Sequence, residues 1–201
     1  GAGAVDGGDQ DIDRPRPLAH VGALARLRPR SVLVVRALPG LGDMLCAVPA
    51  LRALRAALPH ARITLLTLPE VMPVLALYPG LVDAFLAFPG FPGLPETAFD
   101  PAALPPFLAR VQGEHHDLAV QLHGNGMLTN AFVQLLGARD TAGHFLPAVQ
   151  RPQGDGLWLE YPGRGHEIRR LLGLVRFLGA PDDGEDLPLA PDPAHRAGVL
   201  D

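Results

Sequence analysis

The side chain best placed for chemistry is Asp43, which ends the glycine-containing stretch ALPGLGD at residues 37–43. This stretch follows a short apolar run and precedes a helical pattern, so Asp43 should lie where a helix begins. Free N–H groups and the positive end of the helix dipole stabilise a charged carboxylate there. Gly40 and Gly42 would let a substrate or its phosphates approach the backbone. Asp43 is therefore a candidate catalytic base or, more simply, a helix cap.

A second loop, LHGNG at residues 122–126, carries His123, Gly124 and Asn125. It also follows an apolar run and precedes a helical pattern, and the carboxyl ends of parallel strands meet at one edge of a sheet. Both loops are therefore expected to contribute to one cleft. A carboxylate, an imidazole and helix N-termini are components of a transferase site. Each side chain also has a plain alternative, because His123 could be a buried hydrogen-bonded histidine and Asn125 a helix cap.

Neither loop matches a standard nucleotide-binding motif. The dinucleotide fingerprint G-x-G-x-x-G needs a third glycine and an acidic residue after the next strand. Leu45 occupies the third glycine position, and residues 66–68 are Leu, Thr and Leu. A P-loop needs a lysine, and the chain contains none. No cluster with metal-ligand spacing stands out, so no metal site is predicted.

Composition narrows the classes of function. The 201 residues suffice for one sizeable α/β domain. The net charge of −4 gives no indication of a nucleic-acid partner. All 17 basic residues are arginines, so a phosphate-binding cation must be an arginine or a protonated histidine. Cys46 is the single cysteine, which excludes a disulfide framework and is typical of a reducing compartment.

Strand-like and helix-like segments alternate along the chain without a hairpin signal, which predicts a doubly wound parallel sheet. Apolar runs predict strands at residues 32–35, 62–66, 82–88, 117–122 and 141–145. Helical patterns predict the main helices at residues 43–58, 101–112, 129–136 and 166–178.

Glycine, proline and polar residues mark the segments between and around these elements. We expect a flexible lead over residues 1–29 with a short helix at 18–27, a domain over 30–180, and a linker over 181–201. Residues 146–165 are expected to be a loop. The stretch FPGFPGLPE at 88–96 is also a loop, whose phenylalanines would form a lid or contact surface, or fold into the loop itself.

The run from residue 32 to residue 66 resembles the opening of glycosyltransferase family 9, the lipopolysaccharide heptosyltransferases and their relatives. The features that carry the resemblance are Arg36 at a strand end, the Gly42-Asp43 pair, the helical segment PALRAL at 49–54, and Pro59. The similarity continues over residues 117–144 and 166–181, in the same order along the chain.

This resemblance implies the N-terminal half of a GT-B enzyme, in which two Rossmann-like domains face each other across a cleft. The N-terminal domain receives the acceptor, and a C-terminal domain, which these residues do not include, binds the nucleotide-sugar. The implied reaction is inverting, metal-independent transfer of a heptose or related sugar from a nucleotide-diphosphate donor to a hydroxyl of a lipopolysaccharide-type or other glycan acceptor. No cofactor beyond the nucleotide-sugar is expected, and this chain alone is expected to be inactive.

The resemblance also implies roles for individual residues. Asp43 would be the general base. Arg36 and His123 would contact the acceptor, in the binding site that also includes Gly124 and Asn125. Gly40 and Gly42 would lie near the diphosphate. The expected setting is the bacterial cytoplasm, at or near the inner membrane, because the sequence shows neither a signal peptide layout nor an apolar run of about 20 residues.

The sequence departs from the family pattern at several positions. The loop over residues 36–43 is one residue longer and contains Pro39, and Gln121 and His123 replace the usual Asp and Gln. The loop over 88–96 is not a feature of the well-known heptosyltransferases. These differences favour a member outside the standard core-heptose branch. Two other classes stay open, a nucleotide-binding Rossmann module of another enzyme and a non-catalytic glycan-binding relative.

Overall fold

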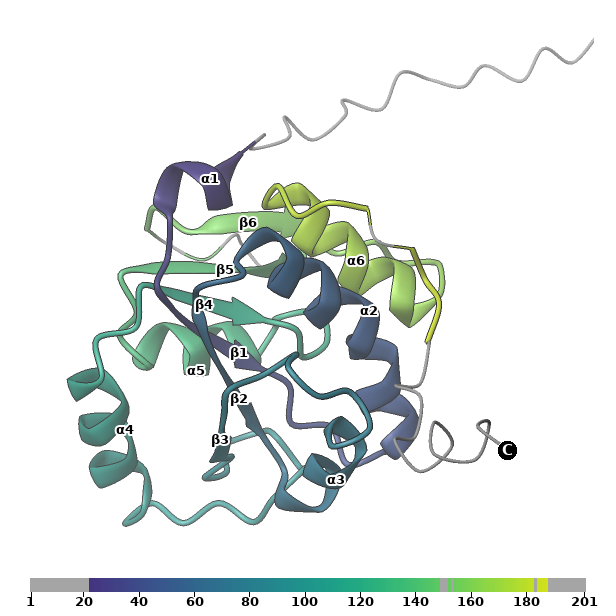
Figure 1. Cartoon of the computed structure of the whole chain (residues 1–201). Coiled ribbons are helices and arrows are strands. Elements are labelled where there is room, and N and C mark those ends of the chain that lie inside the picture. Colours follow the sequence, from purple (N-terminus) through teal and green to yellow (C-terminus); the bar gives the residue numbers. More distant parts are fainter. Residues whose placement is uncertain (1–21, 149–151, 153, 183, 188–201) are drawn as a thin grey trace, which may run out of the picture.

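The computed structural model describes residues 22–148, 152, 154–182 and 184–187 (Figure 1). Most of the expected lead and linker therefore lies outside the described residues. Of the short helix predicted at 18–27, the described part is helix α1 (Ala23–Leu27). Its first residues pack on the domain, since Ala23 and Leu24 are buried.

The centre of the molecule is a six-stranded sheet in which every pair of neighbouring strands is parallel. The strand order is β3-β2-β1-β4-β5-β6. The strands are β1 (Ser31–Val35), β2 (Arg62–Thr67), β3 (Ala84–Ala87), β4 (Leu118–Gln121), β5 (Asp140–Phe145) and β6 (Leu157–Glu160). The order reverses between β1 and β4, which is the switch point where open sheets of this kind bind ligands. The predicted Rossmann-like fold is confirmed.

Helices cover both faces of the sheet (Figure 1). On one face lie α2 (Leu41–Ala57), α6 (Glu167–Phe177) and the short α3 (Met72–Leu75), which follows a 3-10 turn at Pro69–Val71. On the other face lie α4 (Leu104–Gly113) and α5 (Thr129–Leu135). Because both faces are covered, β4 and all of β1 after its first residue are buried, as their continuous apolar patterns predict.

One strand is missing from the sequence-based prediction. Residues 146–165 were expected to be a loop, but β6 lies within them and pairs with β5 in register Ala142↔Leu157. The segment is only four residues long and lies between Gly156 and Pro162, so its apolar run is too short to stand out. As an edge strand it needs a partner on one side only, and β5 supplies that partner.

The start of α2 also differs from the prediction. The helix begins at Leu41, with Gly40 as its N-cap, so Asp43 is the third helical residue instead of the first. It then continues through Pro49 to Ala57. Among the described residues, no helix is long and apolar enough to cross a bilayer.

Candidate functional site

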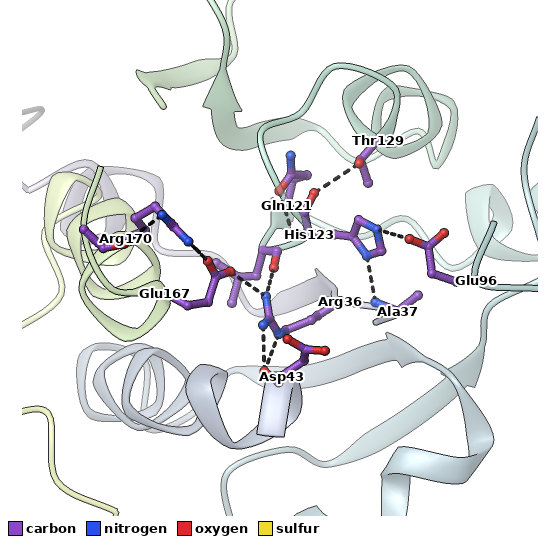
Figure 2. Close-up of polar contacts among 11 residues, drawn as sticks. Arg36, Ala37, Asp43, Glu96, Gln121, His123, Thr129, Glu167 and Arg170 are labelled. Atoms are coloured by element: carbon purple, nitrogen blue, oxygen red, sulfur yellow. Dashed lines mark hydrogen bonds and ion pairs between the residues drawn. The ribbon is translucent and has the colours of Figure 1, made fainter. Parts of the chain in front are cut away.

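The two predicted loops lie side by side at the carboxyl edge of the sheet, on either side of the switch point between β1 and β4 (Figure 2). Asp43 is exposed at this rim, and His123 is buried beside it. The two are close enough for the charge of Asp43 to influence the pKa of His123. The structure therefore brings the predicted carboxylate and imidazole together.

The carboxylate of Asp43 folds back over Gly40. A methyl group built on Gly40 would lie 2.5 Å from Oδ2 of Asp43, so a larger residue there would push this carboxylate out of its position. Around Gly42 the space is open: apart from its own helix turn and chain neighbours, no described atom lies within 4 Å of an added Cβ. Since the N-cap is Gly40 and no side chain caps this helix start, Asp43 is not the cap that the simpler interpretation suggested. It is an exposed carboxylate in the first turn of a helix.

Arg36 has no exposed side-chain surface and holds the Asp43 loop from behind. Its Nε and Nη2 both donate to the main-chain carbonyl of Asp43, at 2.9 and 2.6 Å. Its Nη1 donates to the carbonyl of Leu122 at 2.6 Å and to Oε1 of Glu167 at 3.3 Å. The guanidinium thus joins the two loops and α6, and the predicted contact with an acceptor would require it to leave these partners.

Glu167, the first residue of α6, lies between two arginines. Its Oε1 accepts from Arg36, and its Oε2 accepts from Nη2 and Nε of Arg170 at 2.6 and 3.0 Å. Burial raises the pKa of Glu167, but the hydrogen bonds from Arg170 and the charge of Arg36 outweigh this and hold it below its usual value. Burial also lowers the pKa of Arg36, against the opposing effect of Glu167. The buried positive charge of Arg36 is therefore compensated by the carboxylate of Glu167.

His123 is fixed through both ring nitrogens and its main chain. The N–H of Ala37 donates to Nδ1 at 3.1 Å, so Nδ1 carries no proton and Nε2 does. Nε2 faces Oε1 of Glu96 at 3.1 Å. The main-chain N–H donates to Gln121, and the carbonyl accepts from Thr129. Burial lowers the pKa of His123 despite the charge of Glu96. The ring is therefore a neutral connector, as the plain alternative of a buried hydrogen-bonded histidine predicted.

The predicted residues Gly124 and Asn125 lie at the rim beside His123. Asn125 Oδ1 accepts from the N–H of Met127 at 3.0 Å, so it caps a turn ahead of α5 and not the helix itself. Gly124 has a φ of 68°, in the region that favours glycine, and space is open around it. A cavity of about 180 Å³ begins next to this loop at Gly126 and extends along α5 to Phe145.

A second buried histidine, His144, lies near the end of β5 at the same edge. Its ring meets the ring of Tyr161 edge-on, with centroids 5.4 Å apart, and its Nε2 has no hydrogen-bond partner among the residues that the structure describes. Burial lowers the pKa of His144 to about 4, with Glu167 opposing and Arg170 adding to the shift. His144 is therefore neutral at physiological pH.

Sequence reasoning missed Glu96, Glu167, Gln121 and Thr129 as members of this network. Glu96 follows three prolines and two glycines in a loop, and nothing local in the sequence connects it to His123. For Glu167 a signal existed, because an acidic residue at the first position of a helix is favoured by the dipole. Among the described residues, no group of three or more His, Cys, Asp or Glu side chains is arranged to hold a metal ion.

No protein-family model matches the sequence, and neither does any curated protein. Several solved structures do match in fold, among them three glycosyltransferase structures. One is a glycosyl transferase family 9 protein from Veillonella parvula, at 21% identity and a TM-score of 0.57, covering 76% of this chain and 42% of that chain.

The other two are E. coli heptosyltransferase WaaC with ADP and with ADP-2-deoxy-2-fluoro heptose. Their identities are 16% and 17%, and both have a TM-score of 0.54. Each match covers 76% of this chain, and 48% and 49% of the WaaC chains. This chain therefore spans less than half the length of these three solved chains. At these identities the likeness shows a shared fold, and the described domain has the Rossmann-like fold found in these glycosyltransferases.

Proposed function

We propose that this chain is the acceptor-side domain of an inverting glycosyltransferase with Asp43 as its general base. The observation that carries the proposal is the exposed Asp43 carboxylate at the start of α2, beside the switch point of the sheet. Arg36 anchors the main chain of Asp43, so the backbone that carries this carboxylate is held in place. The fold shared with glycosyltransferase family 9 and heptosyltransferase structures supports the same function.

In the proposed reaction, Asp43 accepts the proton of an acceptor hydroxyl as its oxygen bonds to the anomeric carbon of the donor sugar. The bond from that carbon to the diphosphate breaks, and the diphosphate leaves with the electron pair. A positioned general base contributes roughly 10²–10⁴ to the rate. In this proposal, the N–H groups of the first turn of α2, next to the open space at Gly42, would stabilise negative charge on the leaving group.

The substrates follow from the same proposal. The donor would be a nucleotide-diphosphate sugar, a heptose or a related sugar, bound largely by a second domain outside these residues. The acceptor would be a lipopolysaccharide-type glycan or glycolipid at the cytoplasmic face of a bacterial inner membrane. No metal ion has a part in this mechanism, because the carboxylate and the helix N–H groups supply the base and the charge stabilisation.

The experiment is Asp43→Asn in the full-length protein, assayed with ADP-heptose and other nucleotide-sugars against lipopolysaccharide-type acceptors. Asn keeps the shape but cannot accept the proton, so transfer should fall by roughly 10²-fold or more at an unchanged melting temperature. Asp155→Asn, an exposed carboxylate at the start of β6, is the matched control and should transfer normally. Wild-type turnover in the Asp43→Asn variant would remove Asp43 from the mechanism.

A further inference from the structure

The loop over residues 88–96 is packed down onto the domain. The rings of Phe88 and Phe91 contact Phe132 of α5, with centroids 5.3 and 5.2 Å apart. Gly93, with a φ of 83°, fits against Leu128, since an added Cβ would lie 2.9 Å from its Cδ1. Of the two roles that the sequence left open for the phenylalanines, the structure shows the inward-folded one. This packing delivers the end of the loop to the candidate site.

The end of that loop is Glu96, whose side chain is only 10% exposed. Oε1 faces Nε2 of His123 at 3.1 Å, and Oε2 is buried with no hydrogen-bond partner within the described part of the chain. Leaving a buried polar atom without a hydrogen bond destabilises a fold, and more so when the group is charged. Because this burial destabilises the fold, the position of the Glu96 carboxylate needs an explanation other than stability.

The contacts on the other side of the His123 ring explain why Glu96 is buried there. A proton on Nε2, held by Glu96, leaves the lone pair of Nδ1 free to accept the N–H of Ala37. Ala37 begins the loop that leads to Gly40 and Asp43, and Arg36 holds the far end of this loop through the carbonyl of Asp43. The loop is thus tied at both ends, by Arg36 and by the chain of contacts from Glu96 through His123 (Figure 2).

We propose that Glu96 is a positioning residue for Asp43, acting through His123 and Ala37. The proposal rests on the proposed function of Asp43, and it gives Glu96 no contact with substrate. Glu96 fixes the tautomer and the orientation of His123, and His123 fixes the main chain from which the base is presented. Misplacing a catalytic group by about 1 Å can cost 10²-fold in rate.

Two variants of the full-length protein separate this role from a general structural one. Glu96→Leu removes the acceptor for Nε2, whereas Glu96→Gln retains a carbonyl oxygen that can accept the same hydrogen bond. The matched control is Glu114→Leu, because Glu114 lies 3.1 Å from Nε2 of another buried histidine, His116, which precedes β4 at the opposite edge. We expect Glu96→Leu to lower kcat for transfer roughly 10- to 100-fold with donor KM unchanged. Glu96→Gln and Glu114→Leu should transfer normally.

A second readout does not depend on transfer. In NMR spectra, the His123 ring should show the Nε2–H tautomer, and the Ala37 amide should exchange roughly tenfold faster in Glu96→Leu than in wild type or Glu96→Gln. Unchanged exchange in Glu96→Leu would overturn the proposal, as would a Glu96→Gln variant that is as slow in transfer as Glu96→Leu. If the unaltered protein transfers no sugar, the proposed function fails, while the amide exchange still decides whether Glu96 fixes the loop.

Discussion

Gly40 and Gly42 are two residues apart, yet they meet different surroundings. Gly40 lies under the Asp43 carboxylate, which a side chain at this position would displace. Gly42 is exposed and faces open space, and its backbone does not need the conformational freedom of glycine. Of these two glycines, therefore, only Gly40 affects the position of the Asp43 carboxylate within the domain. At Gly42 the surroundings do not demand glycine, and we propose that the small residue allows a ligand to approach the backbone.

The first prediction concerns this difference. Gly42→Ala should fold normally and gain up to about 1 kcal/mol in helix stability, because alanine is the better helix former. Transfer should nevertheless fall, since the methyl group occupies the space proposed for the diphosphate. Melting temperature and donor KM, measured on the full-length protein, check both parts. A variant with wild-type KM and turnover would show that no ligand approaches the backbone at Gly42.

Local patterns were sufficient to place Asp43 at the sheet edge, because the strand, the glycines and the helix that position it are contiguous in sequence. They were not sufficient for His123, whose expected role in binding depended on which partners its ring nitrogens find. Those partners, Ala37 and Glu96, lie 86 and 27 residues away along the chain. Contacts at such separations are set by the packing of whole loops, which no local motif encodes.

At the scale of elements, the starts of α2 and α6 are joined by a partly buried ion pair. Arg36 holds the main chain at the start of α2, and Glu167 is the first residue of α6. Glu167 also pairs with Arg170 within α6, so it is oriented from both sides. This pair fixes where the two helices begin relative to each other, at the edge of the sheet that carries the candidate site.

Glu167→Leu should destabilise the protein on the order of 3 kcal/mol, because it leaves the Arg36 charge buried without its counter-ion. The exposed pair Arg169–Glu185 provides the comparison on the same helix, and Glu185→Leu should cost less than about 1 kcal/mol. Urea unfolding followed by circular dichroism measures both. Equal, small losses in the two variants would mean that Glu167 does not compensate Arg36.

Burial explains why the central strands were predictable, but it does not separate the two edge strands: β3, which has no fully buried residue, was predicted, and β6 was not. The central strands β1 and β4 are apolar throughout because both of their faces are covered, and this pattern is legible in the sequence. Strand β6, at the edge, is buried over only its first two residues and was missed. Its position is decided by hydrogen bonds to β5, which leave little trace in composition.

For the molecule as a whole, buried histidines predict how stability depends on pH. Burial holds the pKa of His144 near 4, below the value of about 6.5 in an unfolded chain. Between these values the unfolded chain binds more protons than the folded one, so stability falls as the pH falls. The pKa of His123 is also lowered, chiefly by burial, and acts in the same direction.

We therefore expect the free energy of unfolding to be flat near pH 7 and to fall as the pH drops from about 6.5 towards 4. The contribution of His144 over this window is about 3 kcal/mol. His144→Phe, which keeps a ring beside Tyr161, should flatten the profile, whereas the exposed His60→Gln should not. Denaturation series from pH 7 to pH 4.5 make the comparison, and a His144→Phe profile parallel to wild type would contradict it.

The extent of the chain leads to a prediction about nucleotide binding. The match to solved glycosyltransferases covers less than half of each of their chains. If the donor binds mainly to a second domain, the 201 residues alone should bind ADP and ADP-heptose with a Kd weaker than about 1 mM. Titration calorimetry measures this directly. Tight binding would favour a nucleotide-binding module over an acceptor-side domain.

Arg36 donates hydrogen bonds to the main-chain carbonyl of Asp43, whereas the Asp43 side chain is exposed. If Asp43 is the general base, as we propose, scaffold and reactivity reside in separate atoms of one amino acid. Natural selection or protein design can replace the side chain at position 43 without moving the backbone. A chain that diverged here would be expected to keep its architecture and lose or alter its catalysis, so that shape alone is an unsafe guide to activity among proteins built on this plan.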